Sequence, residues 1–338
     1  MAGHVAIIGS GSWGLTLGNL LANKGIRVKI WGRSREKIQK LRETYEDRSR
    51  LPGIRLHSSI EFHFDLKKAI DDADLIVLVV PSQAMRDVVS KLSKLSNFPK
   101  RIVSAAKGIE IGSGKRMSEV IKEVLGDVDV AALSGPSIAL EVAKGEPTSV
   151  VVASEDELFA KEVQFLFHTS LFRVYRSQDI VGVELGGALK NIIAIAAGMA
   201  DGLGFGANTK GALLTRGLAE IIRLGVHMGA QPVTFAGLSG MGDLITTCFS
   251  RHSRNRYVGE ELGKGKKLKD ILSGMNMVAE GVYTTEAAFR LARRLHVEMP
   301  ITEVVRSILR GELDPKTAMQ KLLEREPKPE YYLQWAGL

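Results

Sequence analysis

The stretch VAIIGSGSWG (residues 5–14) runs from a short apolar segment into three glycines, Gly9, Gly11 and Gly14, just where a helical pattern begins. Glycines at this spacing between a first strand and a helix are typical of dinucleotide-binding βαβ units. In such a turn Gly9 permits the sharp bend, Gly11 lets the backbone approach a pyrophosphate, and Gly14 lets the helix pack closely on the strand. The unpaired N–H groups at the start of the helix would face the phosphates. A glycine-rich turn without a ligand is the alternative interpretation.

The first half of the chain alternates apolar runs with amphipathic patterns. Strands are predicted at residues 4–9, 27–32, 75–80, 101–106, 130–135 and 148–153. Helices are predicted at residues 12–24, 34–42, 65–73, 83–95, 117–126 and 155–168. The strand segments are apolar throughout, which is typical of strands buried on both faces of a parallel sheet. We therefore expect an α/β fold with a Rossmann-like, doubly wound sheet.

Beyond about Ile180 only helical periodicity remains, as in VGVELGGALKNIIAIAAGMADG (181–202) and TTEAAFRLARRLH (284–296). An amphipathic or buried helix explains each of these segments better than a strand does. We expect a dinucleotide-binding domain over residues 1–182 and an all-helical substrate and catalytic domain over residues 183–338. Because no Pro/Gly-rich linker separates them, a helix should carry the chain across the junction.

Length and composition indicate the number of domains and the cellular compartment that we expect for the protein. The 338 residues are 45% hydrophobic and 25% charged, which is an ordinary globular balance with length enough for two domains. The longest uncharged stretches, such as 191–200, fall short of the roughly 18 apolar residues of a membrane span. The N-terminus has no basic lead and no small-residue cleavage site. Cys248 is the only cysteine, so a cytoplasmic protein without disulfides or integral membrane segments is expected.

The net charge of +8 is spread along the chain, and only 6% of the residues are aromatic. This pattern lacks the concentrated basic face of a nucleic-acid binder. It fits either a solvated basic surface or attraction for anionic small molecules. None of the seven histidines stands at a metal-ligand spacing, so no metal site is expected. A homodimer is compatible with the sequence because two-fold dimers are common among soluble proteins, but no motif requires it.

The end of the second predicted strand bears on cofactor choice. NAD-specific sites usually carry an Asp or Glu about 20 residues beyond the glycines, where it binds the ribose 2′-hydroxyl. Here IWGRSREK (30–37) offers Arg33 and Arg35 instead. An arginine suits a 2′-phosphate, so the sequence admits NADP and does not exclude NAD. The alternative is that Arg33 is an ordinary surface residue.

A lysine interrupts the apolar segment 184–204. Lys190 shares a helix face with the small residues Gly186, Gly187 and Ala194, which would leave room for another body to approach. An apolar neighbourhood lowers the pKa of a lysine because it penalises the charged form. Such a lysine can exchange protons near neutral pH. The alternative is a lysine whose stem packs while its head reaches water.

Other polar residues follow predicted strands or open predicted helices. Carboxyl ends of parallel strands are where ligands bind in open sheets, and a helix start with a hydroxyl, a guanidinium and an amide makes a plausible anion pocket. The candidates are Lys107, Gly135, Ser137, Asp243, Ser253, Arg254 and Asn255. Taken singly, each also fits a solvated loop, a turn, a helix cap or an exposed basic face.

Seven motifs, in this order, span nearly the whole chain: GSGSWG (9–14), SAAKGIE (104–110), SGPS (134–137), ALKNIIAIAAGMADG (188–202), GLSGMGDLITTC (237–248), SRNR (253–256) and VAEGVYT (278–284). Together they resemble the soluble bacterial NAD(P)-dependent sn-glycerol-3-phosphate dehydrogenases. The later motifs are far more specific than the glycine turn. One departure is Ser10, where that family commonly has Ala.

The resemblance implies a reversible hydride transfer between NADPH or NADH and dihydroxyacetone phosphate, giving sn-glycerol 3-phosphate for phospholipid synthesis. It implies that Lys190 is the proton-transfer lysine. The implied substrate contacts are Lys107, Gly135, Ser137, Lys190, Asp243, Ser253, Arg254 and Asn255. Besides the three glycines, the implied cofactor contacts are Ser12, Trp13, Arg33, Lys107, Ala139, Arg254, Val278 and Glu280.

Two other interpretations of the residues stay open. A related dehydrogenase for a carboxylate substrate, such as a β-hydroxyacid dehydrogenase or a ketopantoate-type reductase, would use SRNR (253–256) as a carboxylate clamp. A nucleotide-sensing regulatory protein would need the glycine turn but not Lys190 and Asp243 together.

Overall fold

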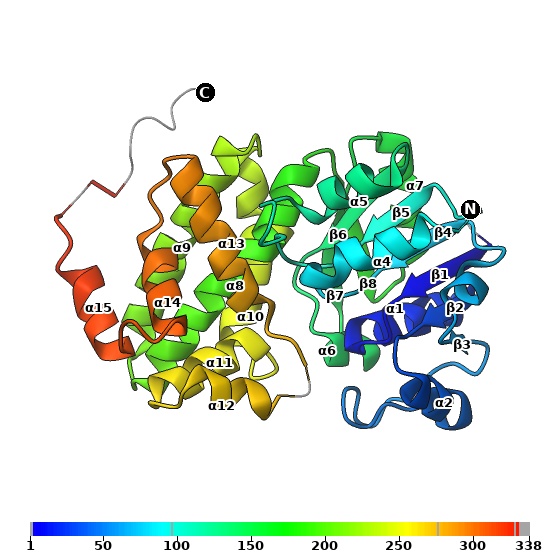
Figure 1. Cartoon of the computed structure of the whole chain (residues 1–338), viewed down its shortest axis with the longest axis horizontal. Helices are drawn as coiled ribbons and strands as arrows, with labels where there is room; N and C mark the ends of the chain where they lie inside the picture. Colours follow the sequence, from blue (N-terminus) through cyan, green and yellow to red (C-terminus); the bar gives the residue numbers. More distant parts are fainter. Residues whose placement is uncertain (1–2, 96, 276, 328, 331–338) are drawn as a thin grey trace.

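The computed structural model describes residues 3–95, 97–275, 277–327 and 329–330. A mixed sheet with helices on both faces forms the first half, and a bundle of helices forms the second (Figure 1). The strands are β1 (His4–Ile8), β2 (Arg27–Trp31), β3 (Glu61–His63), β4 (Leu75–Leu78), β5 (Arg101–Ser104), β6 (Asp129–Ser134), β7 (Thr148–Ala153) and β8 (Phe172–Ser177). Their order in the sheet is β3-β2-β1-β4-β5-β6-β7-β8.

The first six strands have the Rossmann order 3-2-1-4-5-6 and are all parallel, as expected. The expectation of a parallel sheet is wrong for β7, which runs antiparallel to β6, while β8 is parallel to β7. Strands β3 and β8 were not predicted. The fold class is otherwise confirmed.

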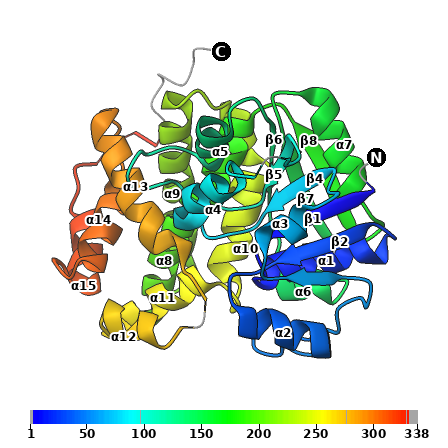
Figure 2. The same cartoon turned by 45° about the vertical axis from the view of Figure 1, so that its right-hand side comes forward.

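Helices cover both faces of the sheet (Figure 2). They are α1 (Ser12–Asn23), α2 (Arg35–Thr44), α3 (Leu66–Ile70), α4 (Met85–Leu92), α5 (Met117–Leu125), the unpredicted α6 (Ala139–Ala143) and α7 (Glu157–Phe167), with a 3₁₀ turn η1 (Ser82–Ala84). Successive residues of β1 enter different cores: Val5 and Ile7 pack on one face, and Ala6 and Ile8 pack on the other. Burial on both faces explains why the strand segments are apolar throughout.

Among the described residues, no strand follows β8. The elements are α8 (Ile180–Gly202), α9 (Ala207–His227), η2 (Pro232–Ala236), the π-helical turn η3 (Leu238–Gly242), α10 (Asp243–Phe249), α11 (Arg254–Gly263), α12 (Leu268–Ser273), α13 (Glu280–Arg294), α14 (Pro300–Leu309) and α15 (Pro315–Leu323). Residues 331–338, which belong to the expected second domain, lie outside the described residues.

Helix α8 joins the two halves. Its first residues Ile180 and Val183 pack in the core of the sheet, while its residues from Leu185 onward pack in the core of the helical half. Of the described helices only α8 is long and apolar enough to cross a membrane, and 94% of its apolar window is buried inside the protein. That burial identifies α8 as the central core helix of the bundle.

Small residues let neighbouring elements approach α8 closely. A Cβ on Gly186 would lie 2.7 Å from the carbonyl oxygen of Ser239 in η3, and a Cβ on Gly187 would lie 2.4 Å from Oγ of Ser134 at the end of β6. On the α11 side, a Cβ on Gly259 would lie 1.9 Å from the carbonyl oxygen of Ile195. The room that the sequence leaves around α8 is therefore filled by other parts of this chain.

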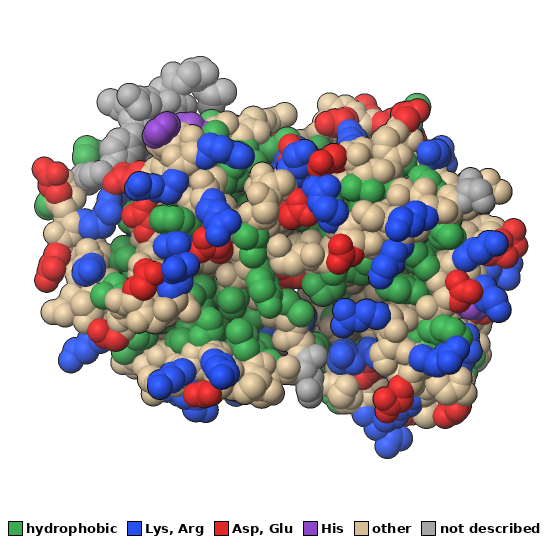
Figure 3. All heavy atoms as spheres, in the orientation of Figure 1, with side chains coloured by type: hydrophobic (Ala, Val, Ile, Leu, Met, Phe, Trp, Pro, Cys, Tyr) green, Lys and Arg blue, Asp and Glu red, His purple; other side chains and the backbone are tan. Residues whose placement is uncertain are grey.

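Charge is distributed over the surface. On the face shown in Figure 3, Lys and Arg side chains occur over both halves and are interspersed with Asp and Glu.

A groove with about 380 Å³ of internal space lies between α1, α6 and the segment leading into β8. It lies beside the helix that the glycine turn opens.

Candidate active site

The glycine turn has the geometry that a dinucleotide requires. Gly9 has φ +133°, and a Cβ there would lie 2.3 Å from the carbonyl oxygen of Val79. A Cβ on Gly14 would lie 1.9 Å from the carbonyl oxygen of Gly9, so α1 can pack here only with glycine. Around Gly11 nothing lies within 4 Å, and no side chain caps the start of α1. The open space and uncapped helix start fit a pyrophosphate.

Three further predicted cofactor contacts lie around this turn. Ser12 is buried in the first turn of α1, and the half-buried Trp13 has its ring centroid 6.3 Å from that of Phe172. Ala139 opens α6, and its carbonyl oxygen accepts a hydrogen bond from Thr16 Oγ1 at 3.0 Å. This bond fixes α6 against α1, so Ala139 lies beside the helix that carries the glycines.

The structure distinguishes the two arginines beyond β2. Arg35 places its guanidinium carbon 4.4 Å from the ring centroid of Phe64. Arg33 is exposed, and no partner for its guanidinium occurs among the described residues. Because Arg35 is engaged in a cation–π contact, Arg33 is the one of these two arginines whose guanidinium has no partner among the described residues.

Lys190 is buried, with 5% of its surface exposed, so it does not reach out to solvent. Its Nζ donates to Asp243 Oδ1 at 2.9 Å and to Thr247 Oγ1 at 2.5 Å. Burial lowers the pKa of Lys190 to about 8; Asp243 opposes the shift and the nearby Lys107 adds to it. An ammonium has three N–H donors, and no third acceptor occurs among the described residues. One N–H is therefore available to a ligand.

Lys107 approaches the same carboxylate from the sheet. It follows β5, and its Nζ donates to Asp243 Oδ2 at 2.6 Å, to the carbonyl oxygen of Gly135 at 2.9 Å and to Ser137 Oγ at 3.5 Å. Asp243 thus bridges two lysines. Burial alone would raise the pKa of Asp243, but the two ammonium groups outweigh burial and hold that pKa below its usual value. The centre accordingly holds two cations and one anion.

Local backbone geometry positions the partners of Lys190 and Lys107. Gly135 has φ +127° and turns the chain away from the end of β6, which exposes its carbonyl oxygen to Lys107. The π-helical turn η3 immediately precedes Asp243 at the start of α10. Such turns are frequent at functional sites because they reorient the residues that follow. Thr247 lies one helical turn after Asp243, so both side chains share the face toward Lys190.

The start of α11 lies next to this centre. Asn255 Nδ2 donates to Asn191 Oδ1 at 2.8 Å, and Asn191 Nδ2 donates to the carbonyl oxygen of Lys107 at 3.5 Å. Ser253 uses its hydroxyl to cap α11, accepting from Arg256 N at 3.2 Å. Arg254 Nη1 donates to the carbonyl oxygen of Val278 at 3.1 Å. The chain of amides therefore links the predicted anion pocket to the lysine centre.

Glu280 ties the two halves together at the predicted cofactor cleft. Its carboxylate accepts from Ser82 N at 3.0 Å and from Ser82 Oγ at 2.5 Å. Burial raises its pKa, and the hydrogen bonds from Ser82 and the charge of Arg254 oppose that rise. Val278 is partly exposed beside it. Thus α13 is attached to the loop that follows β4.

Three residues of the site were not predicted: Thr247, Asn191 and Ser82. Thr247 stands four residues after Asp243, and Asn191 directly follows Lys190, so helical spacing could have identified both as neighbours. Ser82 carried no such signal, because its partner Glu280 is distant in the sequence.

A glycine turn shaped for a dinucleotide in a sheet of Rossmann order, together with a buried lysine whose pKa is lowered, is typical of a Rossmann-type oxidoreductase. The models for the N-terminus and the C-terminus of NAD-dependent glycerol-3-phosphate dehydrogenase match residues 4–160 and 179–320. The chain belongs to this NAD-dependent glycerol-3-phosphate dehydrogenase family. It is an NAD(P)-dependent oxidoreductase, and the reaction of the family interconverts dihydroxyacetone phosphate and glycerol 3-phosphate.

Individual relatives agree with the family assignment. The chain is 53% identical over 329 residues to a glycerol-3-phosphate dehydrogenase [NAD(P)+] of Prosthecochloris aestuarii, covering 96% of this chain and 99% of the relative. It is 50% identical over 332 residues to that of Chlorobium limicola, covering 97% and 100%. The crystal structure of glycerol-3-phosphate dehydrogenase from Coxiella burnetii matches with a TM-score of 0.92 and 39% identity, covering 95% of this chain and 99% of that one.

Proposed function

We propose that Lys190 is the general acid and base of the reaction and that one half of the chain binds the cofactor while the other half binds most of the substrate. Residues 1–182 would hold the dinucleotide and residues 183–338 would supply the lysine and most of the substrate contacts. The observation that carries this proposal is the difference between the two lysines: Lys107 has three acceptors, whereas Lys190 has two and retains one N–H.

Bound NAD(P)H supplies the hydride, and the protein supplies orientation and electrostatics. As the ketone carbon of dihydroxyacetone phosphate is reduced, negative charge develops on its oxygen. The Lys190 ammonium would stabilise that charge and then donate its proton to the oxygen. In the reverse direction the neutral amine would remove the proton from the hydroxyl group. A pKa of about 8 keeps both protonation states accessible near neutral pH.

Lys107 and the start of α11 would bind the rest of the triose. Ser137 is the most distant acceptor of Lys107, so substrate would replace it at little cost. The guanidinium of Arg254 would hold the phosphate through parallel hydrogen bonds, with Ser253 and Asn255 beside it. A phosphate anchored away from the reacting carbon uses its binding energy to orient the small substrate.

The proposed product feeds phospholipid synthesis, and we place the enzyme in the cytoplasm, with a homodimer as the proposed assembly. The direct test follows nicotinamide absorbance while dihydroxyacetone phosphate is added to the protein with NADPH or NADH. Oxidation of the reduced cofactor is expected with at least one of them. Cofactor binding without turnover would favour the nucleotide-sensing alternative, and turnover only with 2-keto acids would favour the carboxylate-specific dehydrogenases.

A further inference from the structure

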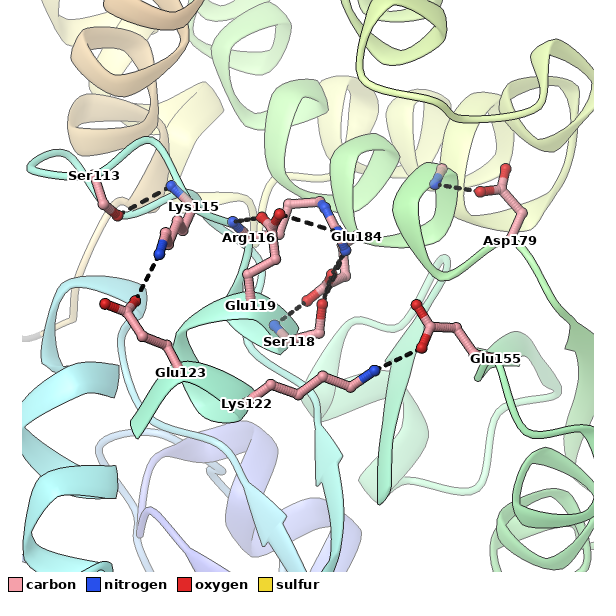
Figure 4. Close-up of polar contacts among 11 residues, drawn as sticks. Ser113, Lys115, Arg116, Ser118, Glu119, Lys122, Glu123, Glu155, Asp179 and Glu184 are labelled. Atoms are coloured by element: carbon pink, nitrogen blue, oxygen red, sulfur yellow. Dashed lines mark hydrogen bonds and ion pairs between the residues drawn. The ribbon is translucent and has the colours of Figure 1, made fainter. Parts of the chain in front are cut away.

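A second buried carboxylate, that of Glu184, lies on α8 six residues before Lys190. Glu184 is 7% exposed, and it faces the first turn of α5 rather than the lysine centre. Its carboxylate accepts from Arg116 Nη1 at 2.6 Å, from Ser118 N at 2.8 Å and from Ser118 Oγ at 2.6 Å. Figure 4 shows these bonds joining α8 to the start of α5. The carboxylate thus caps a helix of the sheet half from the helical half.

The contact between Glu184 and Arg116 is connected to the loop that carries Lys107. Ile109 and Arg116 form an isolated antiparallel bridge, and Glu110 N donates to the carbonyl oxygen of Lys115 at 3.0 Å. These bonds close the loop between β5 and α5, so Arg116 is fixed to the segment that positions Lys107. Glu184 therefore connects the element carrying one active-site lysine to the loop carrying the other.

From these contacts a closed path through the protein can be traced. It runs from Lys190 along α8 to Glu184, through Arg116 and the closed loop to Lys107, and through Asp243 back to Lys190. On the α8 side, Asp179 caps the helix through Gly182 N at 2.8 Å. The start of α8 thus has one carboxylate anchor within its own first turn and one anchor across to the sheet half.

We propose that Glu184, through Arg116, is a positioning residue that sets the place of Lys190 relative to Lys107. The inference rests on the proposed role of Lys190. A buried carboxylate with a charged partner and two further donors has one geometry available, because any displacement leaves charged groups without partners in a poorly solvated region. Proton transfer to a bound ketone is sensitive to such placement: misplacement of about 1 Å can cost 10²-fold in rate.

The test compares Glu184→Gln with Glu220→Gln. Glu220 is a matched control, since it is also buried, with 1% of its surface exposed, and also caps a helix, accepting from Ile301 N at 2.6 Å and Thr302 N at 3.2 Å at the start of α14. Its contacts lie within the helical half and do not lead to either lysine. For each variant one measures kcat for dihydroxyacetone phosphate reduction per NADPH-binding site, the Kd of NADPH, the pH profile and the midpoint of thermal unfolding.

Glu184→Gln is expected to lower kcat about 10- to 100-fold with an unchanged Kd for NADPH. Its pH profile should shift upward, because burial is the main cause of the low pKa of Lys190 and a loosened α8 admits water. Glu220→Gln should keep kcat within about twofold whatever its thermal midpoint. A Glu184→Gln variant with kcat and pH profile like those of Glu220→Gln would overturn the proposal.

Two further variants keep the test decisive. If Glu184→Gln does not fold, Glu184→Asp retains the charge but draws the carboxylate back from Arg116, and it should also lower kcat; a normal kcat would overturn the proposal. Lys190→Met separates this inference from the function on which it rests. Normal turnover in Lys190→Met contradicts the proposed function, whereas an inactive Lys190→Met with a normal Glu184→Gln contradicts only the positioning role.

Discussion

Lys190 and Asp243 form a buried ion pair, with Nζ 2.9 Å from Oδ1, at the junction of the sheet and the helical half. The carboxylate is shared with Lys107, so the centre holds one more positive than negative charge. That excess suits an anionic substrate and a transition state with charge on oxygen. The pair also sets the proton affinity of the lysine, because Asp243 raises a pKa that burial lowers.

The pH dependence of ketone reduction should therefore depend on the negative charge of Asp243, which raises the pKa of Lys190. With Lys190 as the proposed proton donor, reduction requires its ammonium form, so the rate of reduction should fall as the pH rises through about 8, while alcohol oxidation should gain rate. Asp243→Asn removes the charge that raises this pKa and should move the midpoint down by about one pH unit or more. Rate profiles in both directions measure the shift. Asp201→Asn, whose carboxylate pairs with Arg256 instead, is the control; an unchanged or raised midpoint in Asp243→Asn would contradict the account.

Two substitutions in the glycine turn should separate its role in folding from its role in cofactor binding. Gly14→Ala would force a Cβ to within 1.9 Å of a backbone oxygen and should destabilise the protein by about 2 kcal/mol or more. Gly11→Ala meets no atom within 4 Å and has an ordinary φ of −72°, so it should fold normally. Because its methyl group would occupy the space for the pyrophosphate, its Kd for NADPH should rise about tenfold or more. Thermal unfolding and cofactor titration distinguish the two, and equal stability losses would refute this reading of the turn.

Cofactor preference should depend on Arg33 rather than Arg35. Arg33→Ala removes a guanidinium that is open to solvent and should weaken NADPH about tenfold or more, with little effect on NADH, since a charge-assisted hydrogen bond contributes about 1.5–3 kcal/mol. Arg35→Ala, the matched control, removes a guanidinium already stacked on Phe64 and should change both affinities slightly. Titration of each variant with both cofactors gives the ratio. Equal weakening of NADPH and NADH in Arg33→Ala would exclude a 2′-phosphate contact.

Phosphate binding should depend on the guanidinium of Arg254, which can donate two parallel hydrogen bonds. Arg254→Lys keeps the positive charge but cannot form two parallel hydrogen bonds, so the KM for dihydroxyacetone phosphate should rise about tenfold. Arg251→Lys offers an exposed control three residues upstream, and its KM should match that of the unmodified chain. Steady-state kinetics at saturating NADPH measure both. An unchanged KM in Arg254→Lys would move the phosphate site away from α11.

Much of the fold was readable from the sequence because its strongest elements are apolar throughout. The missed strands lack that signal: β3 has only three residues, and the edge strand β8 alternates buried residues such as Phe172 and Val174 with exposed ones. The direction of β7 was also mispredicted, since hydrophobic periodicity shows where a strand lies but not which way it runs.

The site was readable only in part. The sequence indicated Lys190 as a candidate, but an apolar segment cannot distinguish a buried lysine from one that reaches water. The distinction depends on Asp243, which lies 53 residues further along the chain and meets Lys190 only when α10 packs on α8. Similarly, no local pattern indicates that Glu184 pairs with Arg116, 68 residues earlier. The first pair becomes visible only when α10 packs on α8, and the second only when the two halves of the fold meet.

Single-turnover reduction of dihydroxyacetone phosphate by Lys190→Met, with NADPH bound beforehand, tests the central claim most directly. Methionine keeps most of the packing volume and removes the ammonium, so the rate of NADPH oxidation should fall about 10²- to 10⁴-fold while the Kd of NADPH stays the same. A rate close to that of the unmodified chain would show that another group supplies the proton.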